Sequence, residues 1–307
     1  MLREQGDPAM DVLVTGSSGL VGSALVSSLE KQGHRVRRLV RSGAGSSSRF
    51  AWEPECGTID PAALEGVEGV VHLAGESVAG GRWNEARRAL ILESRVKGTR
   101  TLVDAIAKTA TKPKVLVSAS AIGFYGDTGV REVDERSPAG SGFLADVCND
   151  WEAEAARAEA LGVRVVRARI GIVLAKEGGA LAKMKLPFQL GVGGKLGDGS
   201  QWMSWVALED VVGALELALR DEELSGPMNV VSPIPVTNEE FTKAMGRALH
   251  RPTVLPVPRF ALKAAAGGQM AEEMFLGSSR VVPKRLFDAR YAFRSPDLDA
   301  TLARAFS

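Results

Sequence analysis

The sequence predicts an α/β protein built on a doubly wound parallel sheet, with a smaller C-terminal α/β lobe. Three observations support this prediction. Short aliphatic runs alternate with amphipathic stretches from residue 10 to about residue 175, a glycine-rich turn follows the first aliphatic run, and the alternation stops after Leu174. Alternating strands and helices form parallel sheets because each helix returns the chain to the edge where the next strand begins.

The first half of the chain predicts five strands and three helices. Short, mainly aliphatic runs predict buried strands at 12–15, 35–40, 69–73, 114–118 and 164–168. Amphipathic stretches predict helices at 18–32, 83–108 and 143–159. The serine-rich tract 42–48 is expected to be a short flexible loop.

The second half follows a different pattern. Glycines interrupt residues 178–199, which show little periodicity, so we expect loops that form a pocket there. After them the sequence predicts a helix at 206–219, a strand at 228–231, a helix at 238–249 and an extended crossing at 251–258.

Composition favours a small-molecule partner. The chain carries 38 basic and 37 acidic residues, a net charge of +1, which argues against nucleic acid or an anionic membrane as the main partner. No apolar run approaches the roughly 18 to 20 residues of a membrane span, and no hydrophobic signal segment is seen, so we expect a cytoplasmic protein. A monomer and a homodimer are both compatible with these features.

The two cysteines predict no disulfide framework and no metal site. Cys56 and Cys148 are far apart in the sequence and lack His or Cys neighbours at ligand spacing. Both are expected to be reduced thiols. An activated, redox-active Cys148 is a less favoured alternative, since free cysteines are usually inert and buried.

The glycine-rich turn predicts a dinucleotide site. It lies between the first strand and the first helix and reads Thr15-Gly16-Ser17-Ser18-Gly19-Leu20-Val21-Gly22. Gly16 allows the tight turn, Gly19 lets the backbone approach a pyrophosphate, and Gly22 allows close packing of helix on sheet. The helix N-terminus supplies N–H donors to the phosphates. We therefore expect a Rossmann-type domain.

The end of the second strand favours NADP over NAD. The strand ends in Arg41-Ser42, where an NAD-binding protein would carry an acid that accepts from the ribose 2′-hydroxyl. A carboxylate would repel a 2′-phosphate, whereas Arg41 can grip one through a charge-assisted fork. Arg37 and Arg38 are alternative phosphate contacts.

We expect three parts in the chain. Residues 1–9 are polar and predict a disordered extension, and 10–175 form the NADP-binding domain, with further contributions from about 200–232. Residues 176–307 form mainly the smaller, substrate-side lobe.

Combined motifs resemble the extended short-chain dehydrogenases, of which sugar-nucleotide epimerases are the best-known members. The motifs are the glycine turn, Val71-His72-Leu73-Ala74-Gly75 and the run from Ser118 to Gly126. Further motifs resemble an atypical subgroup of epimerase-family proteins with a C-terminal domain of unknown function; they lie at 75–77, 82–83, 94–95, 143–152, 199–205 and 276–299. The resemblance covers nearly all of residues 10–302.

The resemblance implies further cofactor contacts at the ends of later strands and on one helix. These are Leu73, Ala74, Gly75, Glu76, Arg95, Ser118, Ala119 and Gly171.

The resemblance also implies that two catalytic groups are missing. The resembled class uses a Tyr and a Lys four residues later, in which the Lys lowers the pKa of the Tyr that exchanges a proton with the substrate. Anchored on Glu152, the motif places Leu144 at the Tyr position and Cys148 at the Lys position. Neither an alkyl chain nor a neutral thiol can do that work, so the standard carbonyl/alcohol chemistry is in doubt.

Three residues are candidate replacements. Ser120 takes the place of the catalytic Ser when the loop is aligned from its N-terminal end. Counting back from Tyr125 instead puts Ala121 there. Tyr125 is a possible acid, but a packed aromatic is the favoured interpretation. Glu76, at the end of a strand, is a possible acid or base, with a surface or helix-capping role equally plausible.

Other polar and aromatic residues are candidates for the substrate side. Arg82 and Arg95 can hold an anionic substrate or the cofactor phosphates, although such arginines are more often solvated or ion-paired. Trp83, Gln201 and Trp202 are candidate substrate contacts, with core packing the alternative for a Trp. His72 is expected to be a packed, hydrogen-bonded core residue.

Two functions remain open at this stage. The first is an NADP(H)-dependent oxidoreductase or epimerase-like enzyme that uses non-standard acid/base residues on a small polar substrate. The second, favoured by Leu144 and Cys148, is a catalytically silent NADP(H)-binding sensor or interaction protein. Sugar-nucleotide epimerisation by the standard mechanism is disfavoured, because it needs the missing pair.

Overall fold

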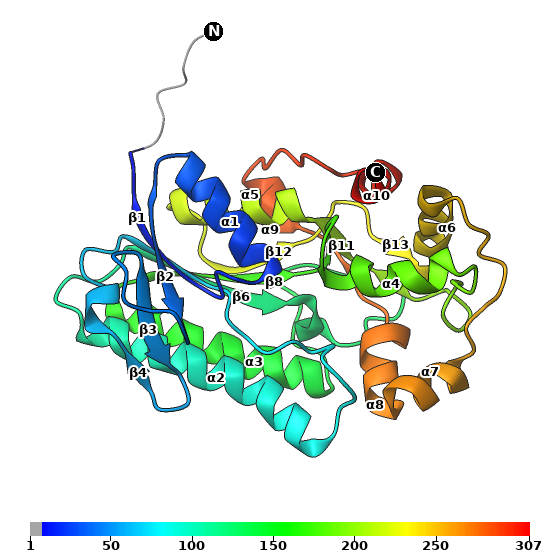
Figure 1. Ribbon diagram of the computed structural model, residues 1–307, viewed down its shortest axis with the longest axis horizontal. Helices are drawn as coiled ribbons and strands as arrows, with labels where there is room; N and C mark the ends of the chain where they lie inside the picture. The colour runs from blue at the N-terminus through cyan, green and yellow to red at the C-terminus, as the bar shows by residue number, and fades with distance from the viewer. Residues whose placement is uncertain (1–7) are drawn as a thin grey trace, which may run out of the picture.

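The central element is an eight-stranded sheet (Figure 1). The computed structural model describes residues 8–307, so most of the expected disordered extension lies outside the described residues. The strands, in spatial order, are β12 (Gly226–Val230), β8 (Arg164–Ile170), β6 (Val115–Ala121), β5 (Gly69–His72), β1 (Asp11–Thr15), β2 (Arg35–Val40), β3 (Arg49–Glu53) and β4 (Thr58–Ile59). All pairs are parallel except β3 with β4, which is antiparallel.

The strand order reverses at the centre of the sheet. From β1 the chain adds β2 and β3 on one side, then crosses to add β5, β6, β8 and β12 on the other. The fold is therefore doubly wound, as the sequence predicts, and its switch point lies between β1 and β5. Open α/β sheets bind their ligands in the crevice at the carboxyl ends of the strands flanking such a point.

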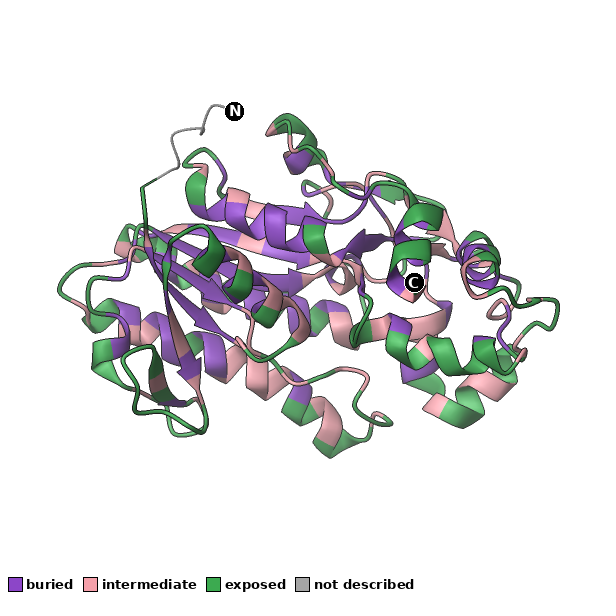
Figure 2. Ribbon diagram, turned by 45° about the horizontal axis from the view of Figure 1, so that its top comes forward, coloured by how far each residue is buried: buried purple, intermediate pink, exposed green. Residues whose placement is uncertain are grey.

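Helices cover both faces of the sheet (Figures 1 and 2). Helices α1 (Leu20–Lys31) and α5 (Leu208–Arg220) pack on one face, around a buried cluster that includes Leu25 and Leu215. Helices α2 (Glu85–Lys108) and α3 (Phe143–Ala156) pack on the other face, where Leu102 and Ala155 are buried. The strands between them are buried on both sides, which explains their aliphatic sequences.

The smaller lobe has its own apolar core at one end of the molecule (Figure 1). Helices α4 (Gly179–Gln189), α6 (Asn238–Leu249) and α10 (Leu298–Phe306) enclose Trp205 of β11 (Trp205–Ala207), which is fully buried. The remaining strands and α-helices are β7 (Glu132–Val133), β9 (Ile172–Leu174), β10 (Trp202–Met203), β13 (Val236–Thr237), β14 (Arg280–Val281), α7 (Arg259–Ala266), α8 (Gly268–Ala271) and α9 (Lys284–Asp288).

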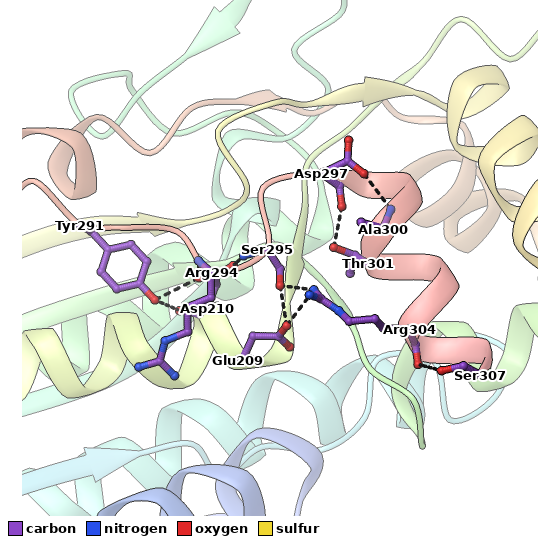
Figure 3. A network of polar contacts seen from close by, with 10 residues as sticks. All are labelled: Glu209, Asp210, Tyr291, Arg294, Ser295, Asp297, Ala300, Thr301, Arg304 and Ser307. Carbon is purple, nitrogen blue, oxygen red and sulfur yellow. Dashed lines mark hydrogen bonds and ion pairs between the residues drawn. The ribbon is translucent and has the colours of Figure 1, made fainter. Parts of the chain in front are cut away.

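A polar network fastens the C-terminal segment to α5 (Figure 3). The buried carboxylate of Asp210 accepts hydrogen bonds from the Tyr291 hydroxyl and from the backbone N–H groups of Arg294 and Ser295. Tyr291 approaches α5 closely, since a Cβ on Gly213 would lie 2.3 Å from its hydroxyl oxygen. This network fixes the course of the chain into α10.

The structure confirms the expected strands and long helices within a few residues and corrects two expectations. The segment expected to be loops contains α4, whose Leu181 and Phe188 are buried in the smaller lobe. Flanking glycines and an internal Pro187 hide this helix in the sequence, and tertiary burial stabilises it. The hairpin of β3 and β4 was also not expected.

No helix of residues 8–307 is long and apolar enough to cross a bilayer.

Candidate functional site

The turn between β1 and α1 requires two of its glycines for packing. Gly16 has a φ of +65°, and a Cβ on it would lie 2.7 Å from the carbonyl carbon of Leu73 at the end of β5. A Cβ on Gly22 would lie 2.1 Å from the carbonyl oxygen of Gly16. Any side chain at either position would push the turn away from the sheet.

Gly19 leaves the mouth of the turn open. It is exposed and precedes α1, which has no side-chain N-cap, and a Cβ on it would meet only the Gly16 oxygen, at 3.3 Å. The first N–H groups of α1, in Leu20, Val21 and Gly22, have no acceptor within the helix. An uncapped helix N-terminus with free approach suits a pyrophosphate. The residues present therefore fit a dinucleotide.

Thr15 has a structural role in this turn. Its buried hydroxyl accepts hydrogen bonds from the backbone N–H groups of Leu73 and Ala74, both at 3.1 Å, and contacts His72 Nδ1 at 2.7 Å. His72 is fully buried, as expected of a core histidine, and its Nε2 contacts Thr99. The hydroxyl thus ties β1 to β5 beneath the turn, while Ser17 and Ser18 lie nearer to solvent.

One arginine at the end of β2 has no side-chain partner among residues 8–307. Arg37 donates to the carbonyl of Ala62 at 2.8 Å, and Arg38 pairs with Glu30 at 2.5 Å. Arg41 is exposed beside Ser42 and forms no hydrogen bond or ion pair within residues 8–307. Of the three arginines considered for a 2′-phosphate, only Arg41 is therefore uncommitted.

Sequence reasoning missed a second arginine beside this loop. The Arg49 guanidinium lies next to Gly43, where a Cβ would be 3.3 Å from its Nη2. Arg49 begins β3, a strand that the sequence did not predict. Because β3 pairs with β2, Arg49 lies near the end of β2. Its only signal in the sequence was a cation after the serine-rich tract.

A buried polar cluster lies at the carboxyl ends of β6 and β8. The Ser120 hydroxyl donates to Glu152 Oε1 at 2.6 Å, and Arg169 forms a two-pronged ion pair with the same carboxylate at 2.8 and 2.9 Å. All three residues are buried. In the sequence, Glu152 is recognisable only as part of a motif, and Arg169 is a cation just beyond a predicted buried strand that no motif marks.

Tyr125 belongs to the same cluster as a packed aromatic. Its hydroxyl donates to Asn229 at 2.7 Å and accepts from Arg169 at 2.9 Å. It is 1% exposed, and burial raises the pKa of Tyr125 to about 12. The guanidinium of Arg169 also lies 3.4 Å from the centre of the Phe124 ring. These contacts favour the packed-aromatic interpretation over that of a replacement acid.

Leu144 and Cys148 lie on α3, next to this cluster. Burial raises the pKa of the Cys148 thiol to about 11, so the thiol is neutral near pH 7. The N-terminus of α3 is capped from the smaller lobe: the carboxylate of Glu273 accepts from the backbone N–H groups of Phe143 and Leu144 at 3.0 and 2.8 Å.

Glu76 and Arg95 lie together just beyond β5. The Glu76 carboxylate pairs with Arg87 at 3.0 Å, and its backbone carbonyl accepts from Arg95 at 3.0 Å. Gly75 before them is exposed. Glu76 is therefore an ion-paired carboxylate just beyond β5, while Arg95 reaches from α2 to the Gly75–Glu76 backbone.

The four candidate substrate contacts all make contacts within the protein. Arg82 donates to the carbonyls of Ala264 and Ala265 at the end of α7. The indole of Trp83 donates to Val78 at 2.8 Å, and the Gln201 amide donates to Leu196 and Phe275. The ring of Trp202 lies 4.5 Å from the Arg280 guanidinium. All four side chains are therefore engaged in contacts within the described part of the chain.

The remaining candidates lie in or beside the sheet. Ser118 and Ala119 are buried within β6. Gly171 follows β8, and a Cβ on it would lie 2.6 Å from the carbonyl oxygen of Ser204, so this position tolerates only glycine. The structure thus gathers the glycine turn, Arg41, the end of β5 and Ser120 along one edge of the sheet.

Comparisons with known proteins match two family models along the chain. Residues 12–231 match the NAD dependent epimerase/dehydratase family, and residues 257–305 match a domain of unknown function, DUF1731. Epimerase family protein Mb2239 of Mycobacterium bovis is 44% identical over 294 residues, covering 96% of this chain and 97% of the relative.

Solved structures show the same fold. The human epimerase family protein SDR39U1 (isoform 2), crystallised with NADPH, superposes with a TM-score of 0.89 at 35% identity, covering 97% of this chain and 99% of the human one. A nucleoside-diphosphate sugar epimerase from Corynebacterium glutamicum superposes with a TM-score of 0.81 at 38% identity, covering 97% of this chain and 58% of the other.

Proposed function

Because this chain belongs to the NAD dependent epimerase/dehydratase family, we propose that it binds NADP(H) and transfers hydride to or from a small polar substrate. The observation that carries the cofactor choice is the uncommitted Arg41 at the strand end where an acid would select NAD. Ser42 follows it in the chain, and the Arg49 guanidinium lies next to Gly43. The NADPH in the crystal structure of the human relative supports the same choice.

The proton-transfer partner must differ from the usual Tyr and Lys. Bound NADP(H) would supply the hydride chemistry. Leu144 has no titratable group, and the neutral Cys148 thiol lacks the positive charge with which a Lys would lower the pKa of a Tyr. Ser120 commits its own proton to Glu152, so its oxygen is presented as an acceptor. We place the substrate hydroxyl at Ser120 Oγ: its proton passes to Ser120 as the Ser120 proton passes to Glu152, and the reverse direction returns both.

Glu76 is the rival proton partner. Its carboxylate is half-exposed beside the crevice, but it is engaged by Arg87. The rival function is a catalytically silent NADP(H)-binding sensor, which the loss of the usual pair favours. Sugar-nucleotide epimerisation by the standard mechanism requires that pair, so we do not propose it.

The cofactor choice is tested with Arg41→Ala. Removing a charge-assisted contact to the 2′-phosphate should weaken NADPH binding roughly tenfold to a hundredfold and leave NADH binding unchanged, measured by calorimetry. Arg38→Ala is the matched control, because Arg38 is already paired with Glu30. Equal affinity of the unmodified protein for NADPH and NADH would refute the assignment.

Activity is tested by screening small carbonyl and hydroxyl compounds at the NADPH absorbance. With a substrate in hand, turnover of Ser120→Ala, Glu76→Gln and Tyr125→Phe is compared. Loss of about 10²-fold or more in Ser120→Ala alone would identify the proton partner. Full activity in Ser120→Ala would refute that role, and an extensive screen without turnover would favour the sensor.

A further inference from the structure

Arg95 of α2 places a positive charge behind the carboxyl end of β5. Its Nη1 donates to the backbone carbonyls of Glu76 and Ile91, both at 3.0 Å. A Cβ on Gly75 would lie 3.3 Å from the central carbon of the guanidinium. The charge therefore lies directly against the Gly75-Glu76 backbone, just beyond the carboxyl end of β5.

The same guanidinium faces α3. It lies 5.0 Å from the centre of the Trp151 ring, and Trp151 is about one helical turn beyond Cys148. Arg95 thus bridges the end of β5 and the part of α3 that carries Leu144 and Cys148. Within residues 8–307 it forms no ion pair with a carboxylate, and its two acceptors are neutral carbonyls.

Two carboxylates near the ends of β5 and β6 form ion pairs with other arginines. Glu76 is paired with Arg87 at 3.0 Å, and Glu152 is paired with Arg169 at 2.8 Å. His72 adds no charge near neutral pH, because burial lowers its pKa to about 4. Counted together, these two carboxylates and three guanidiniums carry one net positive charge, that of Arg95.

We infer that Arg95 makes this site select the reduced cofactor over the oxidised one. The inference rests on the proposed binding of NADP(H). With the phosphates at the N-terminus of α1, the nicotinamide half extends across the switch point to the ends of β5 and β6. The oxidised nicotinamide ring is cationic and the reduced ring is neutral, so a fixed positive charge there disfavours the oxidised form.

A preference for NADPH over NADP⁺ would serve either an enzyme or a sensor. In an enzyme it favours the reductive direction, with NADPH bound and NADP⁺ released. In a sensor it makes occupancy follow the reduced fraction of the NADP pool. A role for Arg95 in holding cofactor phosphates is different, because it would strengthen both redox forms equally.

The test compares dissociation constants of the full chain for NADPH and NADP⁺ by calorimetry. We expect the unmodified protein to prefer NADPH by about tenfold or more, and Arg95→Gln to reduce this preference by about tenfold. Arg95→Lys retains the charge and should retain most of the preference. Arg100→Gln is the matched control, since Arg100 lies on the same helix, half-exposed and paired with Glu154.

2′-Phospho-ADP-ribose, which lacks nicotinamide, serves as a third ligand. Its affinity should be the same in the unmodified protein and in Arg95→Gln. An equal loss of affinity for all three ligands would assign Arg95 to the phosphates and overturn the inference. So would equal affinity of the unmodified protein for NADPH and NADP⁺, a result that needs no variant. Failure of the unmodified protein to bind any of the three would overturn the proposed function as well.

Discussion

The protonation state of His72 follows from the hydrogen bonds of its two threonine neighbours. Thr15 Oγ1 accepts from two backbone N–H groups, so its single proton is directed at His72 Nδ1. Thr99 donates its proton to the carbonyl of Arg95 at 2.7 Å and therefore accepts from His72 Nε2. The imidazole is neutral, with its hydrogen on Nε2, and it links β1, β5 and α2.

This histidine should make folding stability sensitive to mild acid. Its pKa is about 4 in the folded protein and about 6.5 when unfolded, so between these values only the unfolded chain binds the proton. The stability present above pH 6.5 is lost as the pH falls toward 4. Between pH 7 and pH 5 the free energy of unfolding should fall by about 2 kcal/mol through this residue.

Urea unfolding of the unmodified protein and of His72→Gln at the two pH values measures this effect. The variant should lack the 2 kcal/mol component, whereas His250→Asn, at an exposed position, should keep it. The same pH dependence in His72→Gln and the unmodified protein would contradict the burial argument.

The Glu152–Arg169 pair should be strongly coupled. Each group is buried and is the other's only charged partner within 4 Å in the described part of the chain. Glu152→Gln or Arg169→Met alone leaves one buried charge unpaired and should cost about 3 to 5 kcal/mol of stability. The double variant should lose clearly less than the sum, as read from a double-mutant cycle of urea unfolding. Additive losses would show that the pair is not coupled.

At the scale of elements, substitutions at two glycines of the β1–α1 turn should have different effects. Gly19→Val should abolish NADPH binding and retain the circular dichroism spectrum, because the added side chain enters the open mouth of the turn. Gly22→Val should instead lower thermal stability sharply, since even its Cβ would lie 2.1 Å from the Gly16 oxygen. Normal NADPH binding by Gly19→Val would show that the phosphates bind at another place.

At the scale of the whole molecule, the network in Figure 3 holds the C-terminal segment on α5. Asp210→Ala would leave two backbone N–H groups and the Tyr291 hydroxyl without their acceptor, at a cost of about 2 to 4 kcal/mol. Proteolysis in segment 289–297 should also become faster. Glu209→Ala, the half-exposed neighbour, should have a much smaller effect, and equal effects of the two variants would contradict the role of Asp210.

Local pattern was enough to determine the class of fold and to predict which residues form the cofactor end of the site. Strand and helix periodicity depends on residues close in sequence, so the doubly wound sheet was predictable, as was the glycine turn that joins its first strand and helix. The absence of an acid near Arg41 was visible in the same way. Each of these features lies within one short segment.

The tertiary structure decided the features that depend on distant partners. Glu152 meets Arg169 only because α3 packs beside β8, and Arg49 returns to the end of β2 only because β3 pairs there. Helix α4 is stabilised by burial against the smaller lobe rather than by its own sequence. Burial and ion pairing depend on contacts between segments far apart in the chain, and a pattern of neighbouring residues does not contain them.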